Sequence, residues 1–164
     1  MASIVTPQTL KVDITETITL NGVTRNGKAS VSIPTIGQII SGVMQAPAHD
    51  ATPDTAILAS FGDATAAETA TVILSAGVKY VRITNKDDTN DLNVRLGEGA
   101  NSNDNAILRV NPKESLVLSD IVIDADDHSS AALAADAPTF TTMTYIEVSG
   151  QGGNVDVEYY IAAT

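Results

Sequence analysis

The chain has 164 residues, neither cysteine nor tryptophan, and a formal net charge of −11 from 9 Lys+Arg and 20 Asp+Glu. This length suits one domain, or one domain with an arm, and suffices for a single core without metals or disulfides. The composition excludes disulfide frameworks, thiolate zinc sites and thiol catalysis, leaves no run of about 18 apolar residues to cross a membrane, and argues against binding to nucleic-acid phosphates.

The first element is a strand with strict alternation. Residues 10–20 read LKVDITETITL, with apolar and polar residues on opposite faces. Side chains alternate across a strand, so the pattern predicts a half-buried antiparallel strand. Glu16 interrupts the apolar face and indicates a bulge or an edge.

Two turn dipeptides follow this strand. Asn21-Gly22 and Asn26-Gly27 both suit the positive φ angles of tight hairpin turns. A second alternating segment ends at Pro34, because proline donates no ladder hydrogen bond. We therefore expect residues 10–33 to form a β-hairpin with a short tip.

Residues 36–46, IGQIISGVMQA, fit either a helical stripe or a strand. Gly37 and Gly42 disfavour the helix, since an interior glycine costs about 1 kcal/mol, so we expect a strand around residues 41–46. The proline-containing break that follows separates an N-terminal arm, residues 1–46, from a core, residues 55–164.

The core consists of short strands separated by turns. Many short strands at this spacing are typical of a sandwich or barrel, and we expect an antiparallel β-sandwich of jelly-roll type. Its last two strands are expected to form a terminal hairpin, and the alanine-rich residues 125–137 suit either a short helix or a loop. The expected strands are 55–61, 70–75, 78–84, 92–96, 106–110, 115–123, 143–149 and 154–162.

No catalytic, cofactor-binding or metal site is predicted, and we expect no enzyme. His49 and His128 stand in acidic loops, without the nucleophile elbow that a serine hydrolase of the α/β type requires. Asn101, Asn103 and Asn105 have the spacing of the first calcium-loop ligands but lack the later glycine and glutamate, and Asp124, Asp126 and His128 lack the glycine. Asp87, Asp88 and Asp91 cluster in one turn, where solvated carboxylates are ordinary. Only an irregular calcium site is left open.

Five basic residues fall on or near the central strands. They form either a positive strip for an acidic partner or cross-strand ion pairs within the chain, and the second interpretation is favoured. They are Lys79, Arg82, Arg95, Arg109 and Lys113.

Several stretches together resemble small virion structural proteins of tailed phages, notably the short-tailed phages of cyanobacteria. They are the hairpin sequence TETITLNGVTRNGKASVSIPTIGQI with TPDTAILASFG, the turn RITNKDDTN, the strand NPKESLVL and the C-terminal strand DVEYYIA. The resemblance implies a cement or decoration protein on the capsid surface, made in the host cytoplasm. It carries over no functional residues.

The resemblance also implies partners: the major capsid protein and sister subunits in a trimer or dimer. Neither nucleic acid nor a membrane is expected. The alternating N-terminal strand is expected to make these contacts, since an exposed sheet edge binds through main-chain hydrogen bonds. The alternative is a receptor- or carbohydrate-binding module on a tail or fibre, which predicts an exposed platform from Tyr80, Tyr145 or Tyr160.

Overall fold

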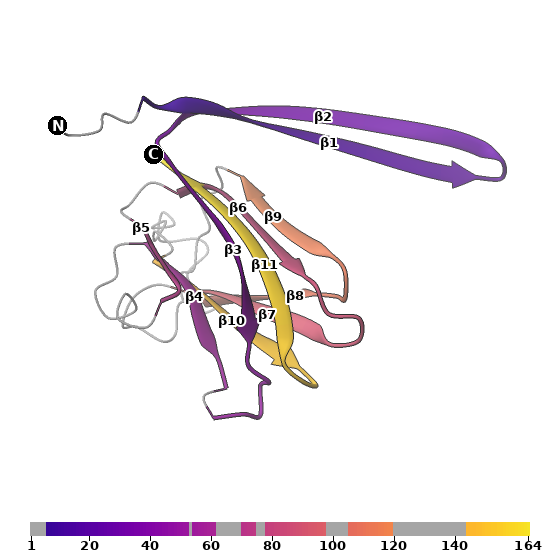
Figure 1. Cartoon of the computed structure of the whole chain (residues 1–164). Helices are drawn as coiled ribbons and strands as arrows, with labels where there is room; N and C mark the ends of the chain where they lie inside the picture. Colours follow the sequence, from indigo (N-terminus) through magenta and orange to yellow (C-terminus); the bar gives the residue numbers. More distant parts are fainter. Residues whose placement is uncertain (1–5, 53, 62–69, 75–77, 98–104, 120–143) are drawn as a thin grey trace, which may run out of the picture.

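The computed structural model describes residues 6–52, 54–61, 70–74, 78–97, 105–119 and 144–164. All regular elements in these ranges are strands, and they form a hairpin and two larger sheets (Figure 1). The hairpin is β1 (Gln8–Leu20) with β2 (Val23–Ile36). The four-stranded sheet has the order β3 (Gln38–Ala46), β11 (Val155–Ala163), β6 (Val78–Asn85) and β9 (Ser115–Ser119). The five-stranded sheet has the order β5 (Val72–Leu74), β4 (Ala56–Phe61), β10 (Tyr145–Gln151), β7 (Asp91–Gly97) and β8 (Asn105–Val110).

The two larger sheets enclose one core, which confirms the predicted β-sandwich. Alternate residues of both sheets point inward and lose contact with water, as period-two strands dictate. All the predicted strands occur, and the sheet pairs are antiparallel except for β4 with β5, which are parallel. The fully buried side chains include Leu58, Leu92, Val94, Ile146 and Val148 from one sheet and Val81, Ile83, Val155, Val157 and Ile161 from the other.

The predicted terminal hairpin is wrong. β10 and β11 belong to different sheets, and the glycine-rich turn between them crosses from one layer of the sandwich to the other. The Gly150 amide donates to the Pro47 carbonyl at 2.7 Å, and the Asn154 side chain accepts from the Ala48 amide at 2.9 Å. Both strands have an apolar face toward the same core, so alternation alone does not distinguish a hairpin from a connection between sheets.

The sandwich begins earlier in the chain than the sequence indicates. We expected residues 38–46 to belong to the arm, but β3 pairs with β11 over its whole length, so the arm ends at Ile36. Gly42 faces the buried Tyr159, whose hydroxyl oxygen would lie 2.5 Å from a Cβ at this position. The glycine therefore serves close packing in the core.

The arm turns once, at Asn21-Gly22. These residues have φ angles of 51° and 78°, the pair of positive values that a two-residue hairpin turn requires. Asn26-Gly27 lies inside β2 instead, where Gly27 pairs with Glu16 in an uninterrupted ladder. The bulge expected at Glu16 does not occur. The register shifts at the base, between Gln8 and Leu10.

The expected helix or loop at residues 125–137 lies outside the described residues, as do residues 120–123 of the strand predicted to begin at Ser115.

Candidate interaction surfaces

The arm has one polar and one apolar face, because residues that pair across an antiparallel ladder share a face. On the polar face, the Ser30 hydroxyl donates to Asp13 at 2.7 Å, and the Lys11 ammonium lies 3.2 Å from the same carboxylate. The Ser30 hydrogen bond, followed by Lys11, lowers the pKa of Asp13. Thr19 and Thr24 share a hydrogen bond of 3.0 Å near the tip. Several side chains of the polar face thus interact with one another within the arm.

The apolar face is covered only at its base. There Ile33 and Ile36 pack on Tyr80 and Ala162 of the four-stranded sheet, and all four are buried. Leu10, Val12 and Tyr160 complete this anchoring cluster. The arm is therefore fixed to the sandwich by side-chain packing at one end.

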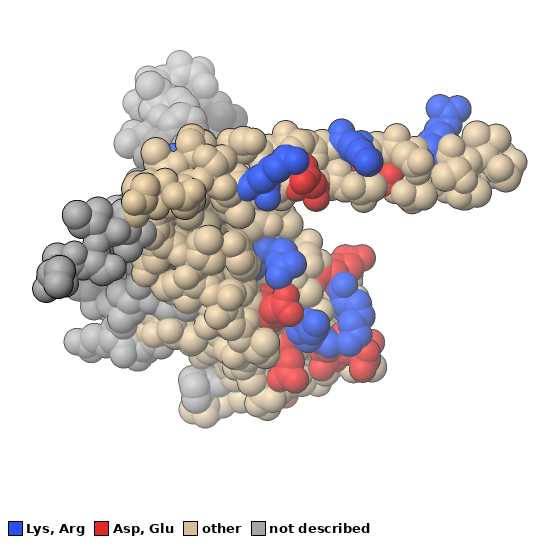
Figure 2. Space-filling view, turned by 45° about the horizontal axis from the view of Figure 1, so that its top comes forward, with Lys and Arg blue, Asp and Glu red and all other residues tan. Residues whose placement is uncertain are grey.

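Beyond the base, the apolar face is open to solvent. Ile18, Leu20 and Val23 are 53%, 60% and 58% exposed, and Ile14 and Val31 are also exposed. Figures 1 and 2 show this part of the arm standing clear of the sandwich, with a tip that is mostly uncharged. We call the face formed by the cross-strand pairs Ile14–Ala29, Glu16–Gly27, Ile18–Arg25 and Leu20–Val23 the tip face.

Of the three tyrosines that the alternative function would place on an exposed platform, Tyr80 and Tyr145 are buried and Tyr160 is half-buried. Tyr80 is buried beneath the arm, where its ring meets Tyr160 edge to face at 5.9 Å between centroids. Tyr145 is also buried, with the Arg95 guanidinium 5.8 Å from the centre of its ring. These tyrosines serve packing, so they offer no exposed stacking surface for a sugar.

Two of the stretches that carry the phage resemblance, RITNKDDTN and NPKESLVL, meet at one end of the sandwich. Asn85, fully buried, donates from its amide to the carbonyls of Asn90 and Val110 at 2.8 and 3.1 Å and accepts from the Asp87 amide at 2.9 Å. The Lys113 ammonium donates to the Lys86 carbonyl at 2.6 Å. The hydrogen bonds that hold these turns thus explain the residue types of Asn85 and Lys113.

Asp87, Asp88 and Asp91, at the same end of the sandwich, each interact with a different partner. Asp87 accepts hydrogen bonds from the amides of Asn90 and Thr89, which lower its pKa. Asp88 lies 2.8 Å from the Lys113 ammonium, and Asp91 lies 3.7 Å from the Arg109 guanidinium. Within the part of the chain that the structure describes, no group of three or more His, Cys, Asp or Glu side chains could hold a metal ion. Residues 101, 103, 124, 126 and 128 of the other calcium-like spacings lie outside that part, and nothing is said of the Asn105 side chain.

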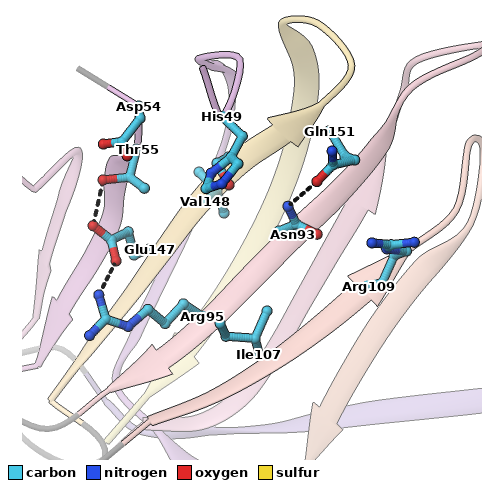
Figure 3. Close-up of a pocket in the computed structure, with 11 residues that line it drawn as sticks. His49, Asp54, Thr55, Asn93, Arg95, Ile107, Arg109, Glu147, Val148 and Gln151 are labelled. Carbon is cyan, nitrogen blue, oxygen red and sulfur yellow. Dashed lines mark hydrogen bonds and ion pairs between the residues drawn. The ribbon is translucent and has the colours of Figure 1, made fainter. Parts of the chain in front are cut away.

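The outer face of the five-stranded sheet carries an open depression of about 530 Å³ (Figure 3). Glu147 lies along one side of it and accepts from Thr55 at 2.6 Å and from Arg95 at 2.9 Å. His49 reaches the depression from the loop before β4. No hydrogen bond joins the His49 side chain to a carboxylate or hydroxyl among the described residues. Glu147 is already engaged, so the depression contains no assembled catalytic triad; His128 lies outside the described residues.

The basic residues of the central strands form ion pairs, which confirms the favoured interpretation for Arg82, Arg95 and Arg109. Arg82 meets Glu158 of the neighbouring strand at 2.7 Å. Arg95 meets Glu147 on β10 at 2.9 Å, and Arg109 meets Asp91 on β7. These residues stabilise neighbouring strands and form no free positive strip.

The part of the chain that the structure describes contains no helix long and apolar enough to cross a membrane. Comparison of the sequence and structure with protein-family models, with curated proteins and with solved structures finds no match.

Proposed function

We propose that this chain is a non-enzymatic structural protein of a phage virion, which binds the capsid surface as a cement or decoration protein and stabilises the head. The observation that carries the proposal is the arm, two strands of 13 and 14 residues with an exposed apolar face. An isolated two-stranded hairpin is marginally stable in water, and monomeric proteins rarely expose large contiguous apolar patches. The tip face is therefore suited to burial against another protein.

The sandwich suits the second requirement of such a protein, a rigid body that holds the arm. Its core is continuous across both sheets, and the buried Asn85 amide ties the turns at one end together. The major capsid protein and sister subunits are the proposed partners, and the capsid surface is the proposed location. Neither nucleic acid nor a membrane enters the proposal. Assembly has to overcome the repulsion of a net charge of −11 per copy, for which apolar contact through the arm is suited.

The proposal includes a jelly-roll topology for the sandwich. With the arm and the short β5 set aside, eight strands remain. Numbered in chain order, the first, eighth, third and sixth form one sheet, and the second, seventh, fourth and fifth form the other. Jelly rolls are double-sheet folds of eight strands found in viral capsid proteins and lectins. The fold alone does not imply the function.

A shortened arm tests the proposal. Deleting residues 13–20 and 23–30 joins Val12 to Val31 through Asn21-Gly22. The Val12–Val31 pair lies on the same face as the Leu20–Val23 pair and is the same type of cross-strand pair, so it can take the place of Leu20–Val23 beside the turn. The anchoring cluster is kept, so the sandwich should remain folded.

The assay is cosedimentation with purified heads that lack the protein, together with its position in an electron-microscopy map of complete particles. We expect the full chain to occupy the head surface and the shortened chain to stay in solution. Normal occupancy by the shortened chain, or absence of the protein from heads, would contradict the proposal. Density on a tail or fibre would favour the alternative, a receptor- or carbohydrate-binding module.

A further inference from the structure

The tip face contains one carboxylate and one guanidinium, in diagonal positions. Four successive cross-strand pairs make up this part of the arm: Ile14 with Ala29, Glu16 with Gly27, Ile18 with Arg25, and Leu20 with Val23. Glu16 and Arg25 form no ion pair with any residue in the described ranges. A face that is otherwise apolar therefore carries two opposite charges without partners.

The Glu16 side chain fills the space over Gly27. The Glu16 side chain bends over the glycine, so that its Oε2 atom would lie 2.9 Å from a Cβ at that position. The carboxylate thus stands on the apolar face above a residue without a side chain. Glu16 is exposed, so its carboxylate is open to a positive group from another molecule.

We infer that two copies of this chain pair through their tip faces about a two-fold axis perpendicular to the arms. Placing the axis between the Glu16–Gly27 pair and the Ile18–Arg25 pair puts Arg25 of the second copy over Gly27, beside the Glu16 carboxylate. The same rotation repeats the contact in reverse, because a two-fold interface is self-complementary. The charges that lack partners in one chain then meet their opposites twice.

Most of the apolar residues match in the same register. The rotation places Ile14 of one arm over Leu20 of the other and Ala29 over Val23, while Ile18 lies over Glu16. Two antiparallel pairs stacked face to face bury their inner faces as a small sandwich. The base of each arm takes no part, because its own tyrosines and Ala162 already cover it.

A second copy fits this face better than an unrelated surface, because the pattern of charge and apolar residues is complementary to itself. The inference names one partner of the proposed assembly protein and in that sense rests on the proposed function. Pairing of this kind needs no capsid, so it is measured on the purified chain. If the chain dimerises but does not bind heads, the pairing stands and the proposed function fails. If the chain is monomeric but binds heads, only the pairing is overturned.

Sedimentation velocity and native mass spectrometry of the full chain test the pairing through charge exchange. The variant E16R carries two basic groups on the tip face, and R25E carries two acidic groups. Each variant alone brings like charges together twice. We therefore expect the dissociation constant of the dimer to rise at least about tenfold. Mixing the two variants places opposite charges together again and should restore a dimer containing one copy of each.

The matched control is K28E, which makes the same charge change as R25E on the polar face, where Lys28 pairs with Thr15. It should dimerise like the wild-type chain, and circular dichroism should show all four proteins folded. A wild-type chain that is monomeric or trimeric would overturn the inference. So would single variants that dimerise normally, or a mixture that forms no mixed dimer.

Discussion

The arm and the sandwich use the same alternating pattern in opposite ways. In the sandwich, each apolar face meets a second sheet and is buried, and ion pairs join neighbouring strands on the outer faces. In the arm, part of the polar face interacts internally and the tip face has no cover. The difference shows that alternation specifies a half-buried strand, whereas the burying partner is specified elsewhere, in the same chain or in another molecule.

The largest expected effect comes from truncating the core. Ile161 is fully buried between the sheets, so Ile161→Ala should lower the free energy of unfolding by about 2–5 kcal/mol, through lost burial and the cavity that remains. Ile18→Ala on the tip face should change it by less than about 0.5 kcal/mol in dilute protein. Urea unfolding followed by circular dichroism measures both. Equal losses would remove the distinction between the two regions.

The next effect concerns the buried amide of the sandwich. Asn85→Ala removes two donated hydrogen bonds and one accepted hydrogen bond and leaves buried backbone groups without partners. We expect a loss of about 1–3 kcal/mol in the free energy of unfolding. Asn93→Ala, at a half-buried amide with one hydrogen bond of 3.4 Å to Gln151, is the control and should cost much less. Similar losses from both would show that the Asn85 network adds no special stability.

A substitution at Thr35, where the arm joins the sandwich, should raise the stability of the protein instead of lowering it. Thr35 has a φ angle of 61° beside Pro34, where the ladder shifts register. A β-branched residue is strained in this left-handed region, which glycine adopts freely. Thr35→Gly should therefore stabilise the protein by about 1 kcal/mol. Thermal unfolding of Thr35→Gly beside Thr15→Gly, at an extended position, checks this. A fall in melting temperature for Thr35→Gly would contradict the account.

The smallest effect is the response to acid. Hydrogen bonds lower the folded pKa of both Asp87 in the sandwich and Asp13 in the arm. Each contribution to stability is complete above the unfolded pKa and is lost as pH falls through the folded pKa. Asp87→Asn should flatten the acid dependence of the melting temperature of the sandwich, and Asp13→Asn should leave it unchanged. An unchanged profile for Asp87→Asn would refute the assignment.

Much of the fold could be predicted from local pattern. Alternation located the hairpin and the core strands, and Asn21-Gly22 marked the turn that the structure uses. The same reasoning could not decide between Asn21-Gly22 and Asn26-Gly27, because only the register of the completed ladder puts Gly27 opposite Glu16. Nor could it separate the sheets of β10 and β11, since both strands face one core.

The candidate surface was predicted in part. The arm was identified from its sequence, whereas its end at Ile36 and its anchoring on Tyr80 and Ala162 depend on contacts between distant segments. The alternative function places Tyr80 on an exposed platform, because sequence does not show which outer-face residues an arm will cover. Glu16 interrupts the apolar pattern of the strand, and the inferred pairing of two arms depends on its charge.

Hydrogen exchange of the arm amides, compared with that of β11, tests the central claim most directly. In dilute protein, the amides of residues 13–31 should exchange fast and those of β11 slowly, because only the latter lie within a buried sheet. On association, whether with a second copy or with heads, the arm should become protected while β11 stays unchanged. Arm amides that are fully protected in the dilute monomer, or that remain unprotected after association, would contradict the account.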